Sequence, residues 1–144
     1  MPLEALVYCS QVVPGLSPGQ SETLVAQSAA HNKIAGVTGI LLFDGARFLQ
    51  YIEGPEDGVA LTYSRILGSS SHCEVVELAR ASGGARRFPY WALRLIRVAE
   101  PDLRIAISSE WRGLRRLRDH AMFQVPTGID RMNELVRPHL EESR

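Results

Sequence analysis

The stretch VTGILLFDGARFLQYIEGP, residues 37–55, contains two strand-like runs, VTGILLF and RFLQYIE, joined through Asp44-Gly45. An Asp-Gly dipeptide between apolar runs is a strong hairpin signal, because the two central residues of a type I′ turn both need positive φ. The pattern therefore predicts two antiparallel strands connected by a tight type I′ turn.

A helix is expected on each side of this hairpin. Gly54-Pro55 opens a helix of about residues 55–67, since proline is favoured in the first turn. The sequence SPGQ at residues 17–20 is typical of a helix start with a capping box, and it predicts a helix of about 18–33.

Three further strands complete the predicted sheet, at about 3–9, 73–80 and 90–98. The resulting order is βαββαββ. This order predicts an α+β fold, a ferredoxin-like sandwich with one additional strand.

The chain after Pro101 has no strand pattern. We expect two helices there, at roughly 108–120 and 128–140, and Thr127 with Asp130 forms a capping box at the start of the second. Together they form a predicted C-terminal two-helix cap.

The chain of 144 residues suits one compact domain. We interpret residues 1–98 as its core and residues 99–144 as a helical cap of the same unit.

Sixteen basic and sixteen acidic residues cancel, which argues against a nucleic-acid partner. No run of eighteen apolar residues is present, so no membrane partner is expected. The start lacks the basic region of a signal peptide, which favours a cytoplasmic location. The cysteines lack metal-site spacing, so no metal is expected.

Polar residues recur on the faces that should meet between sheet and helices. Alternate strand residues share a face, and helix residues four apart share a stripe. The sets expected to share a side are Leu6, Tyr8 and Ser10; Phe48, Gln50 and Ile52; Trp91, Leu93 and Leu95; Leu24, Ser28 and Asn32; and Val59, Tyr63 and Ile66. Gln50 alone could cap a strand end. Four polar groups directed at one slot, namely Tyr8, Ser28, Asn32 and Gln50, indicate a small-molecule site instead.

From Leu6 to Val98 the chain resembles the BLUF domain, a flavin-based blue-light sensor. The matching segments, in family order and spacing, are Val7-Tyr8-Cys9-Ser10, His31-Asn32, Gly36-Val37-Thr38-Gly39, Phe48-Leu49-Gln50-Tyr51-Ile52-Glu53-Gly54, His72 and Arg87-Phe88-Pro89-Tyr90-Trp91. Each segment alone is a weak signal, and the set is highly specific. The chain also resembles the short BLUF proteins, which end in a two-helix cap and carry no attached enzyme.

The resemblance implies an FAD-type flavin between the two helices, with FMN or riboflavin as alternatives. Tyr8 would be the photochemical electron donor and Gln50 the switchable amide. Asn32 would hydrogen-bond the polar edge of the flavin ring, and Trp91 and Leu93 would relay the signal. The expected cofactor-contacting residues are Tyr8, Leu24, Ser28, Asn32, Gln50, Ile66 and His72.

Two positions depart from the family pattern. Ser69 and Ser71 stand where an acidic and a basic residue usually hold the polar tail of the flavin, and Leu93 replaces a methionine linked to signal output. The first departure predicts that FMN and riboflavin compete well with FAD.

A light sensor of this kind needs no ground-state substrate, so we expect no enzyme activity. Two other functions remain open. A degenerate module without flavin would act only through interactions, and a small flavoenzyme would need a substrate opening beside the ring. The colour of the purified protein separates the first alternative from a sensor.

The face of the sheet opposite the flavin should carry Val7, Cys9, Leu49, Tyr51 and Ile96, an apolar surface that needs a cover. The tail is expected to cover it with Ile105, Ile107, Leu114, Leu117, Met132, Leu135 and Val136. The remaining tail surface would bind an unidentified downstream protein or a second copy of the chain as a homo-oligomer.

Overall fold

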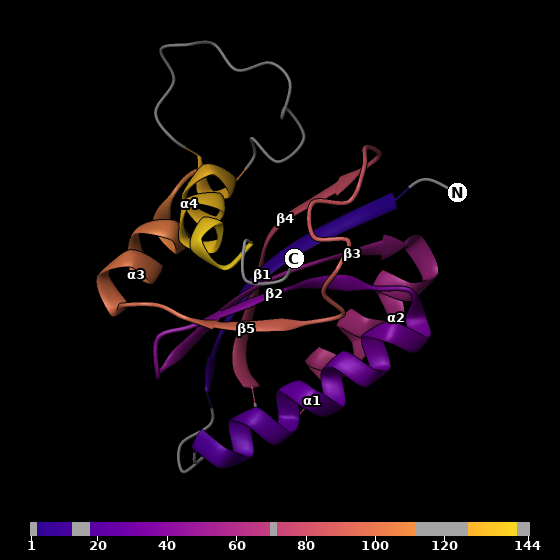
Figure 1. Ribbon diagram of the computed structural model, residues 1–144, viewed down its shortest axis with the longest axis horizontal. Coiled ribbons are helices and arrows are strands. Elements are labelled where there is room, and N and C mark those ends of the chain that lie inside the picture. Colours follow the sequence, from indigo (N-terminus) through magenta and orange to yellow (C-terminus); the bar gives the residue numbers. More distant parts are fainter. Residues whose placement is uncertain (1–2, 13–17, 70–71, 112–126, 141–144) are drawn as a thin grey trace.

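A five-stranded sheet with helices on both faces forms the framework (Figure 1). The computed structural model describes residues 3–12, 18–69, 72–111 and 127–140. In chain order the elements are β1 (Leu3–Val12), α1 (Pro18–Ala35), β2 (Thr38–Phe43), β3 (Arg47–Pro55), α2 (Glu56–Leu67), β4 (His72–Ser82), β5 (Arg94–Arg97), α3 (Glu100–Ser108) and α4 (Gly128–Leu140). This order confirms the predicted ferredoxin-like α+β fold with its additional strand and a cap of two helices.

The strand order in the sheet is β4-β1-β3-β2-β5. β1 lies between β3 and β4 and is antiparallel to both, while the additional strand β5 is parallel to β2. In the β1–β3 register, Tyr8 is directly opposite Gln50. Two residues far apart in sequence are therefore neighbours on one face of the sheet.

The β2–β3 hairpin is confirmed, but its turn is not type I′. Gly45 has a φ of +103°, whereas Glu74 is the sole non-glycine with positive φ among the described residues, so Asp44 lacks the conformation that a type I′ turn requires. The loop instead has three residues between the strands. The Asp44 carboxylate accepts the backbone N–H of Ala46 at 2.9 Å and of Arg47 at 2.7 Å, and these bonds hold the turn.

Helices α1 and α2 cover one face of the sheet, and α3 and α4 lie on the other (Figure 1). The first pair touches at Gly58, where an added Cβ would lie 2.2 Å from the carbonyl oxygen of Ala35. A side chain at this position would therefore force the helices apart.

The second face carries the larger core and confirms the predicted cover. Its buried residues include Val7, Leu49 and Tyr51 from the sheet and Met132 and Val136 from α4. The capping box of α4 is also confirmed: Asp130 accepts the backbone N–H of Thr127 at 3.0 Å, and the hydroxyl of Thr127 accepts that of Asp130 at 3.2 Å.

The tail contains a helix that was not predicted. α3 spans Glu100–Ser108, so the expected helix of 108–120 is wrong over residues 109–111, which are not helical; residues 112–126 lie outside the described part of the chain. Pro101 stands in the first turn of α3, where a proline costs no hydrogen bond, so it starts the helix rather than interrupting the chain.

The helical conformation of α3 determines which of its side chains face the core. Leu103 and Ala106 are buried and Ile107 packs against them, but Ile105 is 44% exposed, so its predicted core position is wrong. Leu114 and Leu117 lie outside the described residues.

The last strand is shorter than the predicted 90–98. β5 begins at Arg94, so Trp91 and Leu93 precede it, and strand alternation does not apply to them. Trp91 packs with the core on the α3/α4 side and stacks on Phe88 at 6.0 Å, whereas Leu93 packs on the α1/α2 side. The prediction that Trp91 and Leu93 share a side is therefore wrong. Among the described helices, none is long and apolar enough to cross a membrane.

Candidate functional site

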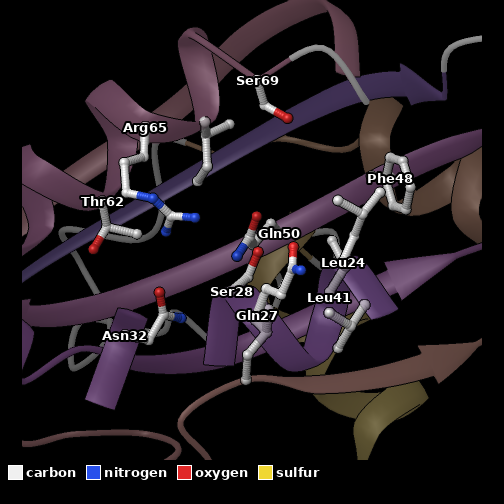
Figure 2. Close-up of a pocket in the computed structure, with 13 residues that line it drawn as sticks. Leu24, Gln27, Ser28, Asn32, Leu41, Phe48, Gln50, Thr62, Arg65 and Ser69 are labelled. Atoms are coloured by element: carbon white, nitrogen blue, oxygen red, sulfur yellow. The ribbon is translucent and has the colours of Figure 1, made fainter. Parts of the chain in front are cut away.

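A pocket opens between α1, α2 and the sheet (Figure 2). The empty space between these elements is about 700 Å³, which includes open solvent at the mouth. The residues that line it are Leu24, Val25, Gln27, Ser28 and Asn32 from α1, Leu41 from β2, Phe48 and Gln50 from β3, Thr62, Arg65 and Ile66 from α2, Ser69 after α2, and Leu93 before β5. The pocket thus has aliphatic and aromatic walls with polar groups at a few points.

Helix α1 has an unusual burial pattern that favours a ligand beside it. Among its described side chains Asn32 alone is buried, and Leu24, Val25 and Ser28 are half-buried where they line the pocket. A helix normally packs an apolar stripe against its sheet. Here the stripe faces open space, which suits a flat, mainly apolar ligand between helix and sheet.

The phenol of Tyr8 donates a hydrogen bond to Oε1 of Gln50. Tyr8 is fully buried and is not one of the residues that line the pocket. Gln50 is 4% exposed and lines the pocket (Figure 2). The amide of Gln50 therefore stands between a buried tyrosine and the space where a ligand would bind.

Burial raises the pKa of Tyr8 well above that of an ordinary tyrosine, and the neighbouring Tyr63 adds to the effect. The two rings lie 5.9 Å apart. Tyr8 consequently keeps its proton at neutral pH and acts as a donor toward Gln50.

Asn32 connects the pocket to the segment that leads into β5. Its Nδ2 donates to the carbonyl oxygen of Ala92 at 2.8 Å. The backbone N–H of Val37 donates to the carbonyl of Asn32, also at 2.8 Å. Asn32 is thus fixed at the inner end of the pocket by contacts on both its backbone and its side chain.

The structure brings most of the predicted site residues together. Leu24, Ser28, Asn32, Gln50, Ile66 and Leu93 line the pocket, and Tyr8 lies behind Gln50. Trp91 is on the opposite side of the sheet. His72 begins β4, and its side chain is outside the described part, as is Ser71.

Sequence reasoning missed Thr62 and Arg65. With Ile66 and Ser69 they form a stripe along α2 at positions three and four apart, so a longer helical stripe would have revealed them. The predicted stripe of Val59, Tyr63 and Ile66 was chosen by its apolar residues, so it did not include the polar Thr62 and Arg65.

The sequence profile of the family described as sensors of blue light using FAD matches residues 3–94. The chain belongs to the BLUF family. The Tyr8–Gln50 hydrogen bond is therefore part of a flavin-based blue-light sensor domain.

Sequence relatives share the BLUF part of longer proteins. The chain is 35% identical over 102 residues to the blue light- and temperature-regulated antirepressor BluF of Escherichia coli strain K12. The match covers 69% of this chain and 25% of that protein. The chain therefore spans about a quarter of the curated relative.

Solved BLUF structures have the same fold. The dark-state structure of the BLUF protein BlrB is 27% identical with a TM-score of 0.69, and the match covers 95% of this chain and 96% of that one. Klebsiella pneumoniae BlrP1 with FMN and cyclic diGMP is 38% identical with a TM-score of 0.60, covering 66% and 26% respectively.

Proposed function

We propose that this chain is a blue-light receptor that holds a flavin in the pocket between α1 and α2 and signals by conformation rather than by catalysis. The observation that carries the proposal is the hydrogen bond from Tyr8 to Gln50 at the base of that pocket. This hydrogen bond links a protonated phenol to an amide that a bound ligand can contact.

The pocket residues fit a flavin. Leu24, Ile66 and Leu93 offer apolar contacts for the ring, and the amides of Gln50 and Asn32 offer donors and acceptors for its polar edge. Ser28 adds a hydroxyl on the α1 wall. FAD is the proposed cofactor, and FMN is the alternative because the related BlrP1 structure contains it.

A bound flavin would supply absorption of blue light and an acceptor for one electron. Tyr8 is the proposed electron donor. A phenol that loses an electron becomes strongly acidic, and Oε1 of Gln50 is placed to accept its proton. The electron and the proton then return to Tyr8, which restores the site without a net reaction.

Gln50 is the proposed switch because its amide carries an acceptor and a donor on one carbon. If the amide rotates by half a turn, or if its proton shifts, Oε1 no longer accepts the hydrogen bond from Tyr8. A different hydrogen-bond pattern then takes its place. The backbone of β3 need not move. The new hydrogen-bond pattern then alters the contacts of neighbouring pocket residues, including the segment of Ala92 and Leu93 that leads into β5.

The proposed output is a change in the contacts of the α3/α4 cap, read by a downstream protein partner or a second subunit. A protein partner is supported by the E. coli relative, which is an antirepressor. No enzyme activity is proposed for this chain.

An absorption spectrum tests the proposal directly. We expect a yellow protein whose flavin band shifts reversibly to longer wavelength under blue light. A colourless protein that takes up no added flavin would support the degenerate interaction module, and turnover of a substrate in darkness would support a small flavoenzyme.

A further inference from the structure

Tyr63 of α2 lies directly beside Tyr8 of β1. The centroids of the two rings are 5.9 Å apart, and the ring planes are tilted by 44°. Both rings pack in the same small core, with Leu6, Ile52 and Val59. A separation of this size is that of a direct aromatic pair. An electron can therefore pass between the two phenols without a bridging group.

Tyr63 stands between Tyr8 and the surface. Tyr8 is fully buried, whereas Tyr63 is half-buried. Tyr63 is not one of the described residues that line the pocket, so a ligand there would meet Gln50 and reach Tyr63 only through Tyr8. The contacts thus run in series from the pocket through Gln50, Tyr8 and Tyr63 to solvent.

The charges around Tyr63 favour the loss of an electron there. The guanidinium of Arg80 lies 6.0 Å from the centre of its ring and donates hydrogen bonds to Glu4 at 3.1 Å and to Glu77 at 2.9 Å. Two carboxylates and one guanidinium leave an excess of negative charge. Burial raises the pKa of Tyr63, Glu77 raises it further, and Arg80 opposes them. Negative charge stabilises an oxidised ring, and the half-buried phenol can release its proton to water, which the enclosed Tyr8 cannot do.

We propose that Tyr63 is a second redox-active tyrosine, which re-reduces Tyr8 after its photochemical oxidation and so opens a path for electrons from a soluble reductant to the pocket. The proposal rests on the proposed function, because the oxidant is the flavin excited by blue light. It adds a light-driven transfer of one electron to a site otherwise described as a conformational switch.

Each step of this path moves one electron. Tyr8 gives one electron to the photoexcited flavin and its phenolic proton to Gln50. Tyr63 then gives one electron to Tyr8, which takes its proton back from Gln50, while the phenolic proton of Tyr63 passes to water. A soluble reductant such as ascorbate returns one electron to Tyr63, which regains a proton from water. Without a reductant, the electron returns from the flavin and the site is restored.

The test measures the bleaching of the flavin absorption band under continuous blue light, in the absence of oxygen and with excess ascorbate. The full chain loaded with flavin is compared as wild type, Tyr63→Phe, Tyr63→Trp, Tyr8→Phe, the double variant Tyr8→Phe with Tyr63→Phe, and Tyr90→Phe. Tyr90 is 83% exposed in the segment before β5 and serves as the matched control. The reversible red shift of each sample without ascorbate is the second measurement.

Tyr63→Phe should keep the red shift, because Tyr8 and Gln50 are unchanged, and should bleach several-fold more slowly than the wild type. Tyr63→Trp should recover much of the rate, since an indole also loses single electrons, whereas a role in packing alone would be served by phenylalanine. Tyr8→Phe should also bleach slowly, and the double variant should be no slower, because the two residues act in series. Tyr90→Phe should match the wild type.

Equal bleaching rates in the wild type and Tyr63→Phe would overturn the assignment of Tyr63 while leaving the light sensor intact. So would a further loss of rate in the double variant relative to Tyr8→Phe. Loss of the red shift in Tyr63→Phe would also overturn it, because Tyr63 would then belong to the switch itself. If the wild type bound no flavin at all, the proposed function and this inference would fail together.

Discussion

Nδ2 of Asn32 lies 2.8 Å from the carbonyl oxygen of Ala92, and this hydrogen bond ties helix α1 to the segment that enters β5. The two neighbours of Ala92 point to opposite sides of the sheet. Leu93 lines the pocket, and Trp91 packs with the core beneath α3 and α4. A change in the pocket at Asn32 or Leu93 can therefore reach the cap through a single short segment of backbone.

Tyr8→Phe and Gln50→Leu should each retain flavin and lose the light-induced red shift. The first removes the electron donor with its proton, and the second removes the amide that rearranges. Absorption spectra before and after blue light measure the effect. Tyr51→Phe is the matched control, because Tyr51 is a buried tyrosine on the other face of the same sheet, and it should keep the shift. A normal reversible shift in either of the first two variants would show that the assigned mechanism is wrong.

Asn32→Ala should weaken flavin retention. It leaves the carbonyl of Ala92 without its donor and removes an amide from the inner end of the pocket, and a loss of this kind costs about 1–3 kcal/mol. The dissociation constant for FMN should rise by about tenfold or more. His31→Ala, at the neighbouring exposed position of α1, serves as control. Unchanged affinity in Asn32→Ala would exclude Asn32 from the binding site.

Glu53→Gln should destabilise the fold. Glu53 is 2% exposed and its carboxylate accepts the backbone N–H of Arg87 at 3.0 Å, that of Phe88 at 2.8 Å, and the hydroxyl of Tyr51 at 3.1 Å. Glutamine has one acceptor oxygen, so its NH₂ group would face a donor. We expect a loss of about 1–3 kcal/mol in the free energy of unfolding, measured with urea.

Glu56→Gln provides the comparison for Glu53, because Glu56 is exposed at the start of α2 and should change little beyond its small contribution to the helix dipole. Equal stabilities of the two variants would mean that the three hydrogen bonds of Glu53 contribute nothing measurable.

Light should change hydrogen exchange in the cap, within residues 100–111 and 127–140. The segment of Trp91 and Ala92 joins the pocket to the core under α3 and α4, so a rearranged Gln50 should alter the packing of the cap. Exchange in darkness and under blue light, followed by mass spectrometry, provides the measurement. The same comparison on Gln50→Leu should show no difference. Identical exchange in the wild type, with the spectral shift intact, would remove the cap from the signalling path.

Several parts of the fold followed from neighbouring residues alone. The hairpin at Asp44-Gly45 and the helix start at Thr127 with Asp130 depend on turn chemistry and capping. These are local properties of the chain, and the structure confirms both except for the type of turn. Strand alternation also predicted which face Tyr8 and Gln50 each occupy within their own strands, but it is the β1–β3 register that places them opposite each other.

Contacts between distant residues decided the rest. Pro101 could begin a helix or end a segment, and packing of Leu103 and Ala106 on the sheet settled that choice. Trp91 and Leu93 lie on opposite sides because both precede β5, and the carbonyl of Ala92 between them accepts a hydrogen bond from Asn32, sixty positions earlier. The direction of Arg65 likewise depends on a pocket built from both helices and the sheet. Periodicity predicts which residues share a face only while the chain remains a regular helix or strand, and these positions are set by side chains that the local sequence does not contain.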